Sequence, residues 1–364
     1  METLIERLGE PWLLAAGGLG VGLLFGFFAQ RSRFCLRSAV IEFARGQSGG
    51  KLTVWLFAFA TAVLATQALA WGGVLDLANA RQLAARGSLS GALVGGALFG
   101  MGMVLARGCS SRLLVLAAQG NLRSVVSGLV FAVTAQAAWT GALSPLRNRI
   151  AAGWTVDGGA ARDLLALLGA GPRTAVLFGA VWLLAAVWWA RRQRVPVWGW
   201  AGALGVGGCI AAAWAFTSAV AQASFEPTPV QALSFTGPSA EVLARVLFVS
   251  DKPASFDMGL VPGVVLGSFL AAAWFGELKL EGFHGGTHMA RSMAGAVAMG
   301  FGGMLAGGCA VGAGLSGAAV FSLTAWLTLS AMWAAAALTD RWLDAAAAAA
   351  PDQPISRSFA RSST

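Results

Sequence analysis

The stretch GMGMVLARGCSSR (100–112) returns 200 residues later as GFGGMLAGGCAVG (300–312). The two copies agree without a gap at Gly100/Gly300, Gly102/Gly302, Leu105/Leu305, Ala106/Ala306, Gly108/Gly308 and Cys109/Cys309. In each copy, an apolar run of helical character ends at Gly-Cys. A helix that ends inside lipid leaves carbonyl groups without partners, which is tolerated only where protein or water surrounds them. The repeat therefore predicts two re-entrant breaks deep in a membrane protein.

The composition is that of a chain with many membrane spans. Of the 364 residues, 57% are hydrophobic and 11% are charged, whereas soluble domains carry about 25% charged residues. The net charge is +9, but the basic residues lie between apolar runs rather than on one face. We therefore expect them to orient the chain in a lipid bilayer, and we expect no nucleic-acid partner.

Apolar runs of about 20 residues, the length that spans a bilayer, predict an all-α membrane protein with about nine transmembrane helices. The runs lie at 12–29, 53–71, 89–106, 125–143, 174–190, 198–216, 258–275, 289–305 and 321–338. We expect four short re-entrant helices in addition, and they lie next to Cys35, Cys109, Thr236 and Cys309.

A second repeat supports a division into two halves. The motif RFCLRSAV around Cys35 aligns with SFTGPSAEV at an offset of 201 residues, so that Thr236 takes the place of Cys35. An odd number of intervening spans turns the second half upside down, which is the inverted repeat of many transporters. The predicted units are a first repeat, a connecting loop with a linker helix, a second repeat and a disordered tail, at 1–150, 151–195, 196–345 and 346–364.

The basic run Arg191-Arg192-Gln193-Arg194 is the strongest orientation signal, because cytoplasmic loops are rich in Lys and Arg. If the fifth span ends there in the cytoplasm, the N-terminus is periplasmic and the C-terminus is cytoplasmic. The loop around Cys35 then also faces the cytoplasm.

The residues at the breaks indicate a small anion that contains sulfur. The predicted spans hold no Asp, Glu or Lys, so the ionisable groups of proton or sodium pumps are missing from them. Broken helices direct N–H groups into a site and favour anions, and a thiol is a soft, polarizable group. The candidate residues are Cys35, Cys109, Cys309, Arg33, Arg37, Arg107, Arg112, Thr236, Gly108 and Gly308.

Other reactive residues have simpler interpretations. Cys209 lies in a plain helical run and is interpreted as a small buried hydrophobe. His284 and His288 have a spacing that would place a metal pair on a helix, but the glycines between them argue against a helix there. We expect neither a metal nor another cofactor.

With these motifs in order, the chain resembles the YeeE/YedE family of bacterial inner-membrane transporters of sulfur compounds. The resemblance rests on GFFAQRSRFCLRSAV, GMVLARGCSSRLLVLAAQGNLRS, SFTGPSAE and GGMLAGGCAVGAGLSG, which lie in both halves. It implies an hourglass-shaped protein in which thiosulfate passes Cys35, Cys109 and Cys309 through S–H···S contacts without covalent chemistry. It also implies a cytoplasmic sulfur-carrier partner of the TusA-like type.

Two alternatives stay open beside thiosulfate uptake by a protein that is not an enzyme. The same fold could move sulfite, a selenium compound or another sulfur anion. A membrane sulfurtransferase with a persulfidated cysteine is the second alternative, since Arg33 and Arg37 could lower the pKa of the Cys35 thiol.

Overall fold

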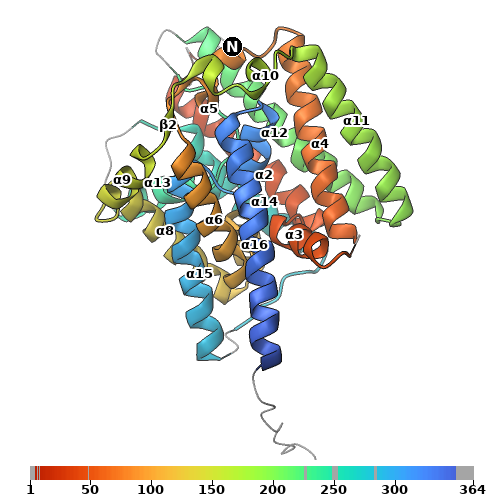
Figure 1. Cartoon of the computed structure of the whole chain (residues 1–364), viewed down its shortest axis with the longest axis vertical. Helices are drawn as coiled ribbons and strands as arrows, with labels where there is room; N and C mark the ends of the chain where they lie inside the picture. The colour runs from red at the N-terminus through yellow and green to blue at the C-terminus, as the bar shows by residue number, and fades with distance from the viewer. Residues whose placement is uncertain are drawn as a thin grey trace, which may run out of the picture.

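The computed structural model describes residues 5, 7, 9–47, 49–224, 228–247, 253–282 and 285–349. Within these ranges the long helices are α2 (Glu10–Ser32), α4 (Gly50–Trp71), α6 (Leu89–Leu105), α8 (Leu122–Trp139), α11 (Pro172–Arg192), α12 (Val197–Ala223), α14 (Phe256–Trp274), α15 (Gly286–Leu305) and α16 (Leu323–Ala349). Figure 1 shows them stacked along one long axis, with α15 and α16 extending furthest at the lower end.

Short elements fill the breaks and connections. Those at the breaks are α3 (Leu36–Ala44), α7 (Ser110–Ala118), α13 (Thr236–Leu247) and the π-helical turn η3 (Gly312–Gly317). Those in the connections are η1 (Leu77–Asn79), α5 (Arg81–Ala84), α9 (Ser144–Ala152), η2 (Gly159–Ala161) and α10 (Leu164–Leu167). A small antiparallel sheet of β1 (Gly87–Ser88) and β2 (Thr155–Val156), which the sequence patterns do not predict, ties the start of α6 to the connecting segment.

The all-α membrane class is confirmed. Each predicted span lies on one of the long helices, and seven segments of the described chain are long and apolar enough to cross a membrane. They are Glu10–Ala44, Gly50–Trp71, Leu89–Ala118, Leu122–Trp139, Pro172–Arg192, Val197–Ala223 and Phe256–Trp274. Helices α15 and α16 are not among them, because glycine, polar and charged residues lower their hydropathy. The number nine therefore stays a prediction.

The outer faces of the long helices suit lipid. Large apolar side chains such as Leu177, Leu184 and Leu270 are more than half exposed. In water such a surface would be unfavourable, since burying apolar area is the main driving force of folding. The exposed apolar faces therefore agree with a bilayer around the helices.

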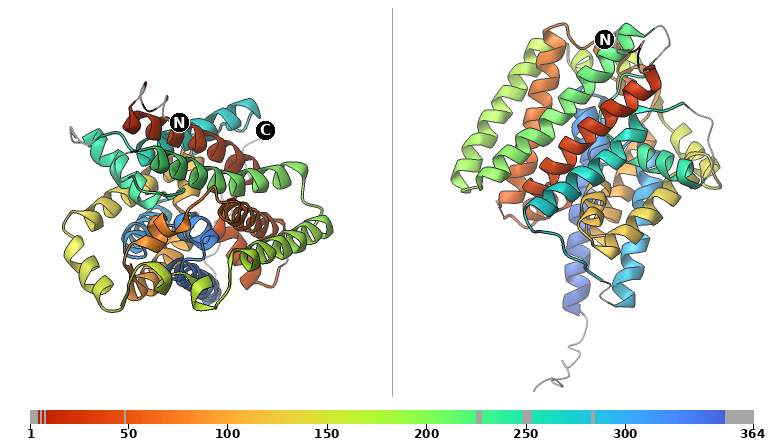
Figure 2. Two further views of the ribbon diagram at one scale, coloured as in Figure 1. Left: turned by 90° about the horizontal axis from the view of Figure 1, so that it is seen from above. Right: turned by 180° about the vertical axis from the view of Figure 1, so that it is seen from behind.

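Long helices of the first half pack against long helices of the second half. Helix α2 packs on α14 and α12 on α4, while α6 packs on α16 and α15 on α8. Figure 2 shows α2 and α14 side by side on the face turned away from the viewer of Figure 1. Glycines make the close approach possible, since a Cβ on Gly18 or Gly259 would overlap a backbone carbonyl of the facing helix.

The two repeated glycine helices, α6 and α15, run antiparallel and cross closely. A Cβ on Gly95 would lie 2.5 Å from Ala306 N, and a Cβ on Gly295 would lie 2.6 Å from Ala106 N. The contacts are thus reciprocal at the 200-residue offset of the sequence repeat. They fit two inverted halves, although the pseudo-symmetry of the complete halves stays a prediction.

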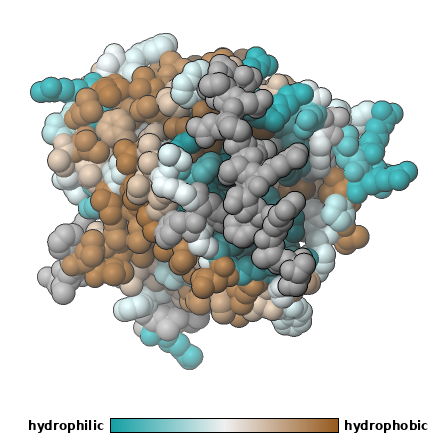
Figure 3. Space-filling model, turned by 90° about the horizontal axis from the view of Figure 1, so that it is seen from below, coloured by the Kyte–Doolittle hydropathy of each residue, from teal (hydrophilic) through white to brown (hydrophobic). Residues whose placement is uncertain are grey.

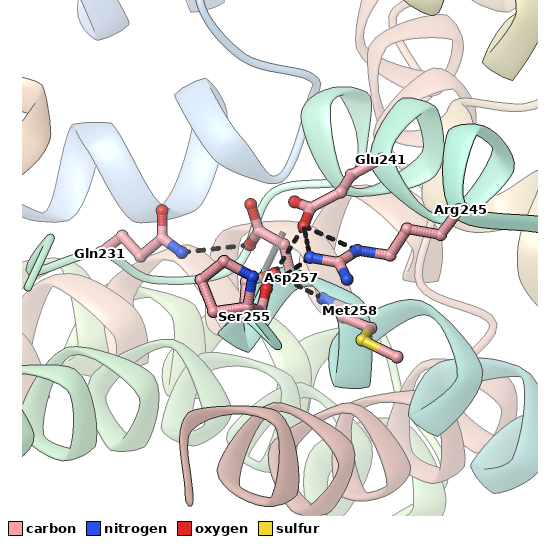
Figure 4. A network of polar contacts seen from close by, with 7 residues as sticks. Gln231, Glu241, Arg245, Ser255, Asp257 and Met258 are labelled. Atoms are coloured by element: carbon pink, nitrogen blue, oxygen red, sulfur yellow. Dashed lines mark hydrogen bonds and ion pairs between the residues drawn. The ribbon is translucent and has the colours of Figure 1, made fainter. Parts of the chain in front are cut away.

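Two of the short helices at the breaks are tied to the long helices that follow them. On α3, the Glu42 carboxylate accepts hydrogen bonds from the backbone N–H groups of Lys51 and Leu52, at 3.1 and 2.9 Å, in the first turn of α4. On α13, Glu241 accepts a 2.8 Å hydrogen bond from Ser255 Oγ, next to the start of α14. Figure 4 shows this second network, in which Arg245 also pairs with Glu241 at 3.1 Å.

Two helices run past their predicted ends. Helix α12 continues to Ala223 and α16 to Ala349. The predicted disordered tail, 346–364, therefore begins inside α16, and residues 350–364 lie outside the described part of the chain.

Candidate functional site

The first break places Cys35 at the start of α3. Helix α2 ends at Ser32, and Arg33 adopts a left-handed conformation with φ 52°, which turns the chain. Cys35 follows in an extended conformation as the residue before α3 and is 7% exposed. A left-handed φ costs energy for a residue other than glycine, so the surrounding structure must hold this turn.

The second break is built in the same way. Helix α6 ends at Leu105, and Arg107 adopts a left-handed φ of 59°. Cys109 then precedes α7, and its side chain is fully buried. Its sulfur lies 3.4 Å from Ser111 Oγ, within hydrogen-bonding distance for sulfur.

The structure brings the two thiols together. The side chains of Cys35 and Cys109 lie close enough to interact, and both lie within electrostatic range of Arg112. Arg112 Nη1 is buried without a hydrogen-bond partner in the described part of the chain. The thiol pair and this guanidinium therefore offer a soft group and a positive charge at one point.

A cavity of about 290 Å³ reaches this point. It is lined by Arg33, Arg112 and Gln119, and also by Lys279 in the connection between α14 and α15. Two carboxylates also line it, Glu277 and Glu281; Glu277 is engaged by Arg31 in a 3.0 Å ion pair. The cavity is wide enough to admit a small hydrated anion to the arginine side of the thiol pair.

The third break holds Cys309. Here Gly307 takes the left-handed turn, with φ 75°, at the position that Arg107 occupies in the first half. The Cys309 sulfur accepts hydrogen bonds from the backbone N–H groups of Phe235, at 3.3 Å, and Gly312, at 3.4 Å. Cys309 is fully buried, so its thiol faces protein and not lipid.

Thr236 begins α13 beside the third break. Its side chain is 1% exposed, and its Oγ1 has no hydrogen-bond partner among the described residues. A Cβ on Gly303 would lie 2.7 Å from this oxygen. The hydroxyl thus lies against α15, close to the break that carries Cys309.

The helices that lead to Cys109 and Cys309, α6 and α15, end at different levels of the molecule. Ala106 lies beside Gly295, and Ala306 beside Gly95. Eleven residues of helix separate these two levels, which is about 16 Å along the axis at 1.5 Å per residue. The described contacts therefore form one thiol pair and one separate thiol, and a continuous path along all three thiols stays a prediction.

The glycines before the cysteines differ in surroundings. A Cβ on Gly308 would lie 3.0 Å from Ala313 N, whereas a Cβ on Gly108 would meet its nearest atom at 3.4 Å, in Arg112. Both glycines are buried. Their place at the ends of α6 and α15 keeps them candidates for backbone contact with an anion.

Of the other two predicted arginines, Arg37 lies within electrostatic range of Cys35 and of Arg107. They share their surroundings with Arg123 and Arg291, which the sequence patterns did not single out. Both missed residues stand near the ends of predicted spans, where arginine ordinarily serves as a membrane anchor. The sequence alone therefore did not indicate that Arg123 and Arg291 lie close to the break at Arg107.

Metal binding finds no support within the described ranges, where no group of three or more His, Cys, Asp or Glu residues comes together. His284 lies outside the described residues, and His288 lines a cavity with arginines. Cys209 is buried in the middle of α12.

Comparison with known proteins shows which family the chain resembles. The family model described as "Sulphur transport" matches residues 31–338. The chain is 27% identical over 322 residues to a protein of Spirochaeta thermophila named thiosulfate transporter TsuA, covering 85% of this chain and 93% of that protein. It is 26% identical over 334 residues to an Escherichia coli protein of the same name, covering 86% and 90%. Because the family model covers most of its length, this chain belongs to the sulphur transport (YeeE/YedE) family.

Proposed function

We propose that this protein takes up thiosulfate across the bacterial inner membrane and that Cys35, Cys109 and Cys309 contact the terminal sulfur of the anion without covalent bonds. The observation that carries the proposal is the buried contact between Cys35 and Cys109 beside the charge of Arg112. The names of the two relatives point to the same substrate.

The chemistry of thiosulfate matches both parts of this site. Its terminal sulfur is soft and polarizable, as a thiol is, while its oxygens carry the negative charge that a guanidinium and half-helix N–H groups stabilise. Conduction needs several weak contacts rather than one tight site. Non-covalent S–H···S contacts at two levels, with Arg112 at one of them, meet this requirement.

The proposed orientation follows from charge. In Figure 1 α11 runs downward to the end that carries Arg191 and Arg192, and α16 also runs downward to its C-terminal end, which lies further down. The start of α2 lies at the upper end. Since Lys and Arg mark the cytoplasmic side, we assign the lower end to the cytoplasm, where a TusA-like sulfur carrier would receive the anion.

Uptake of sulfur-labelled thiosulfate into proteoliposomes that hold only this protein tests the proposal. We expect uptake by the wild type and a strong loss in Cys109→Ala and Cys309→Ala. Cys209→Ala is the matched control, because Cys209 is also buried but lies inside a continuous helix. Unchanged uptake in both break variants would refute the role of the thiols, and absence of wild-type uptake would refute the substrate.

Two further measurements separate the alternatives. Mass spectrometry after turnover should show Cys35 unmodified, whereas a persulfide on Cys35 would indicate a sulfurtransferase. Competition by sulfite or selenium oxyanions should be weaker than competition by unlabelled thiosulfate. Stronger competition by one of them would assign the transporter to that anion.

A further inference from the structure

A cluster of arginines lies next to the thiol pair and touches it through Arg37, which is within electrostatic range of Cys35. Among the described residues, Arg37 of α3 lies within electrostatic range of Arg107 and Arg291, and Arg123 of α8 lies within range of Arg107 and Arg37. We call Arg37, Arg107, Arg123 and Arg291 the four-arginine cluster. Its members come from α3, the break after α6, α8 and α15, so tertiary packing alone assembles it.

The described carboxylates balance the positive charge of this cluster only in part. Glu281 acts on Arg123, but it also accepts a 2.5 Å hydrogen bond from Asn121. Asp340 acts on Arg37, but it is bonded to Arg45 at 2.8 Å. In the described part of the chain, none of the four arginines takes part in an ion pair.

Two guanidinium nitrogens of the cluster also lack partners. Nε of Arg37 and Nε of Arg291 are buried, and neither donates a hydrogen bond to an acceptor among the described residues. A buried N–H of a charged group that lacks an acceptor is costly. Like charges gathered at one place add to that cost, and a bound anion would relieve both.

A cavity lies in front of the cluster. It has a volume of about 370 Å³, and its polar lining residues are Arg107, Asn121, Arg123, Glu281, His288 and Arg291. Because it lies between the end of α6 and the start of α15, it belongs to the lower end of the molecule in Figure 1. Figure 3 shows the molecule from below, where hydrophobic residues gather mainly on the left and hydrophilic residues show in part near the middle and at the right edge.

The cavity adjoins the route to the thiol pair. Asn121 and Glu281 line both this cavity and the one that reaches Arg33 and Arg112. An anion that leaves the thiol pair toward the lower end would therefore meet the four-arginine cluster next. This continuity favours a free anion over the headgroup of a lipid at the rim.

We propose that the four-arginine cluster is a second anion site that binds a small divalent oxyanion by charge and guanidinium hydrogen bonds, without selecting for sulfane sulfur. Its role as a release site rests on the proposed transport function, whereas the binding itself does not. Guanidinium groups suit this task, since their planar forks bind oxyanions through paired N–H groups.

Equilibrium binding of labelled sulfate to the purified wild-type protein, in a chloride-free buffer, tests the site. Sulfate is the probe because it has the charge and oxygens of thiosulfate but no terminal sulfur. Arg291→Gln and Arg123→Gln should each weaken binding by about tenfold, the usual loss for a hydrogen bond to a charged group. Arg291→Lys should weaken it less, because the charge is kept. Arg149→Gln on the exposed face of α9 is the control for net charge.

Three results would overturn the inference. They are an absence of saturable sulfate binding, an equal loss in Arg149→Gln, and displacement of sulfate by phosphatidylglycerol in nanodiscs, which would assign the cluster to lipid headgroups. Thiosulfate uptake by the same wild-type preparation is measured in parallel. Uptake without sulfate binding would remove the second site and leave the transport proposal standing.

Discussion

Substitution of Gly95 by alanine tests the close crossing of α6 and α15. A Cβ there would lie 2.5 Å from both Ala306 N and Gly302 O, and ordinary contact begins at 3.4 Å. The two helices would have to separate by about 0.9 Å at this point, or bend. Overpacking of this kind typically costs about 1–3 kcal/mol.

Helix propensity acts in the opposite direction. Alanine is better than glycine in a helix interior by about 1 kcal/mol. The net change at Gly95 is therefore a loss of stability of up to about 2 kcal/mol. Gly128 on α8 is the matched control, since a Cβ there meets nothing within 4 Å. Gly128→Ala should keep the propensity gain and be stabilised by up to about 1 kcal/mol.

The assay is thermal unfolding of the purified proteins in one detergent, with uptake measured in parallel. We expect Gly95→Ala to melt a few degrees below the wild type and Gly128→Ala to melt at or above it. Gly295→Ala should resemble Gly95→Ala, because its Cβ would lie 2.6 Å from Ala106 N and Gly102 O. If Gly95→Ala proved as stable as Gly128→Ala, the reasoning about a tight crossing would be refuted.

Three other substitutions have expected outcomes. Ser88→Ala removes the hydroxyl that caps the start of α6, where Ser88 Oγ accepts a 2.8 Å hydrogen bond from Gly91 N. The substitution should lower the free energy of unfolding by about 1 kcal/mol, which thermal unfolding would measure. Arg162→Gln removes a guanidinium that donates to Ala85 O and to Thr324 Oγ1 from a residue that is only 7% exposed. Burial lowers the pKa of this guanidinium, and loss of its hydrogen bonds should reduce the free energy of unfolding by about 1–3 kcal/mol. A melting temperature equal to that of the wild type would argue against a structural role. Gln67→Leu removes a 2.7 Å hydrogen bond to Ala319 O and should destabilise by about 1 kcal/mol, which a calorimetric scan of the same preparation would detect.

Sequence alone determined where the helices lie and where they break. Hydropathy is a local property, and a run of about 20 apolar residues is long enough to span lipid whatever its neighbours are. The breaks could be predicted for the same reason, because Gly-Cys after an apolar run marks a helix end within the residues that form it. The identity of Cys109 and Cys309 as break residues thus needed no coordinates, and the repeat of RFCLRSAV as SFTGPSAEV indicated the break at Cys35.

Only the tertiary structure decided which breaks meet. Cys35 contacts Cys109 across 74 residues of chain, while Cys309 bonds to the amide of Phe235, and no periodic pattern distinguishes these outcomes. The sequence likewise could not predict that Arg123 and Arg291 come together, because each has the position of an ordinary membrane anchor in its own segment. Contacts of this kind depend on how α6, α8 and α15 pack through their glycine faces, and that packing is a property of several helices together rather than of one stretch of sequence.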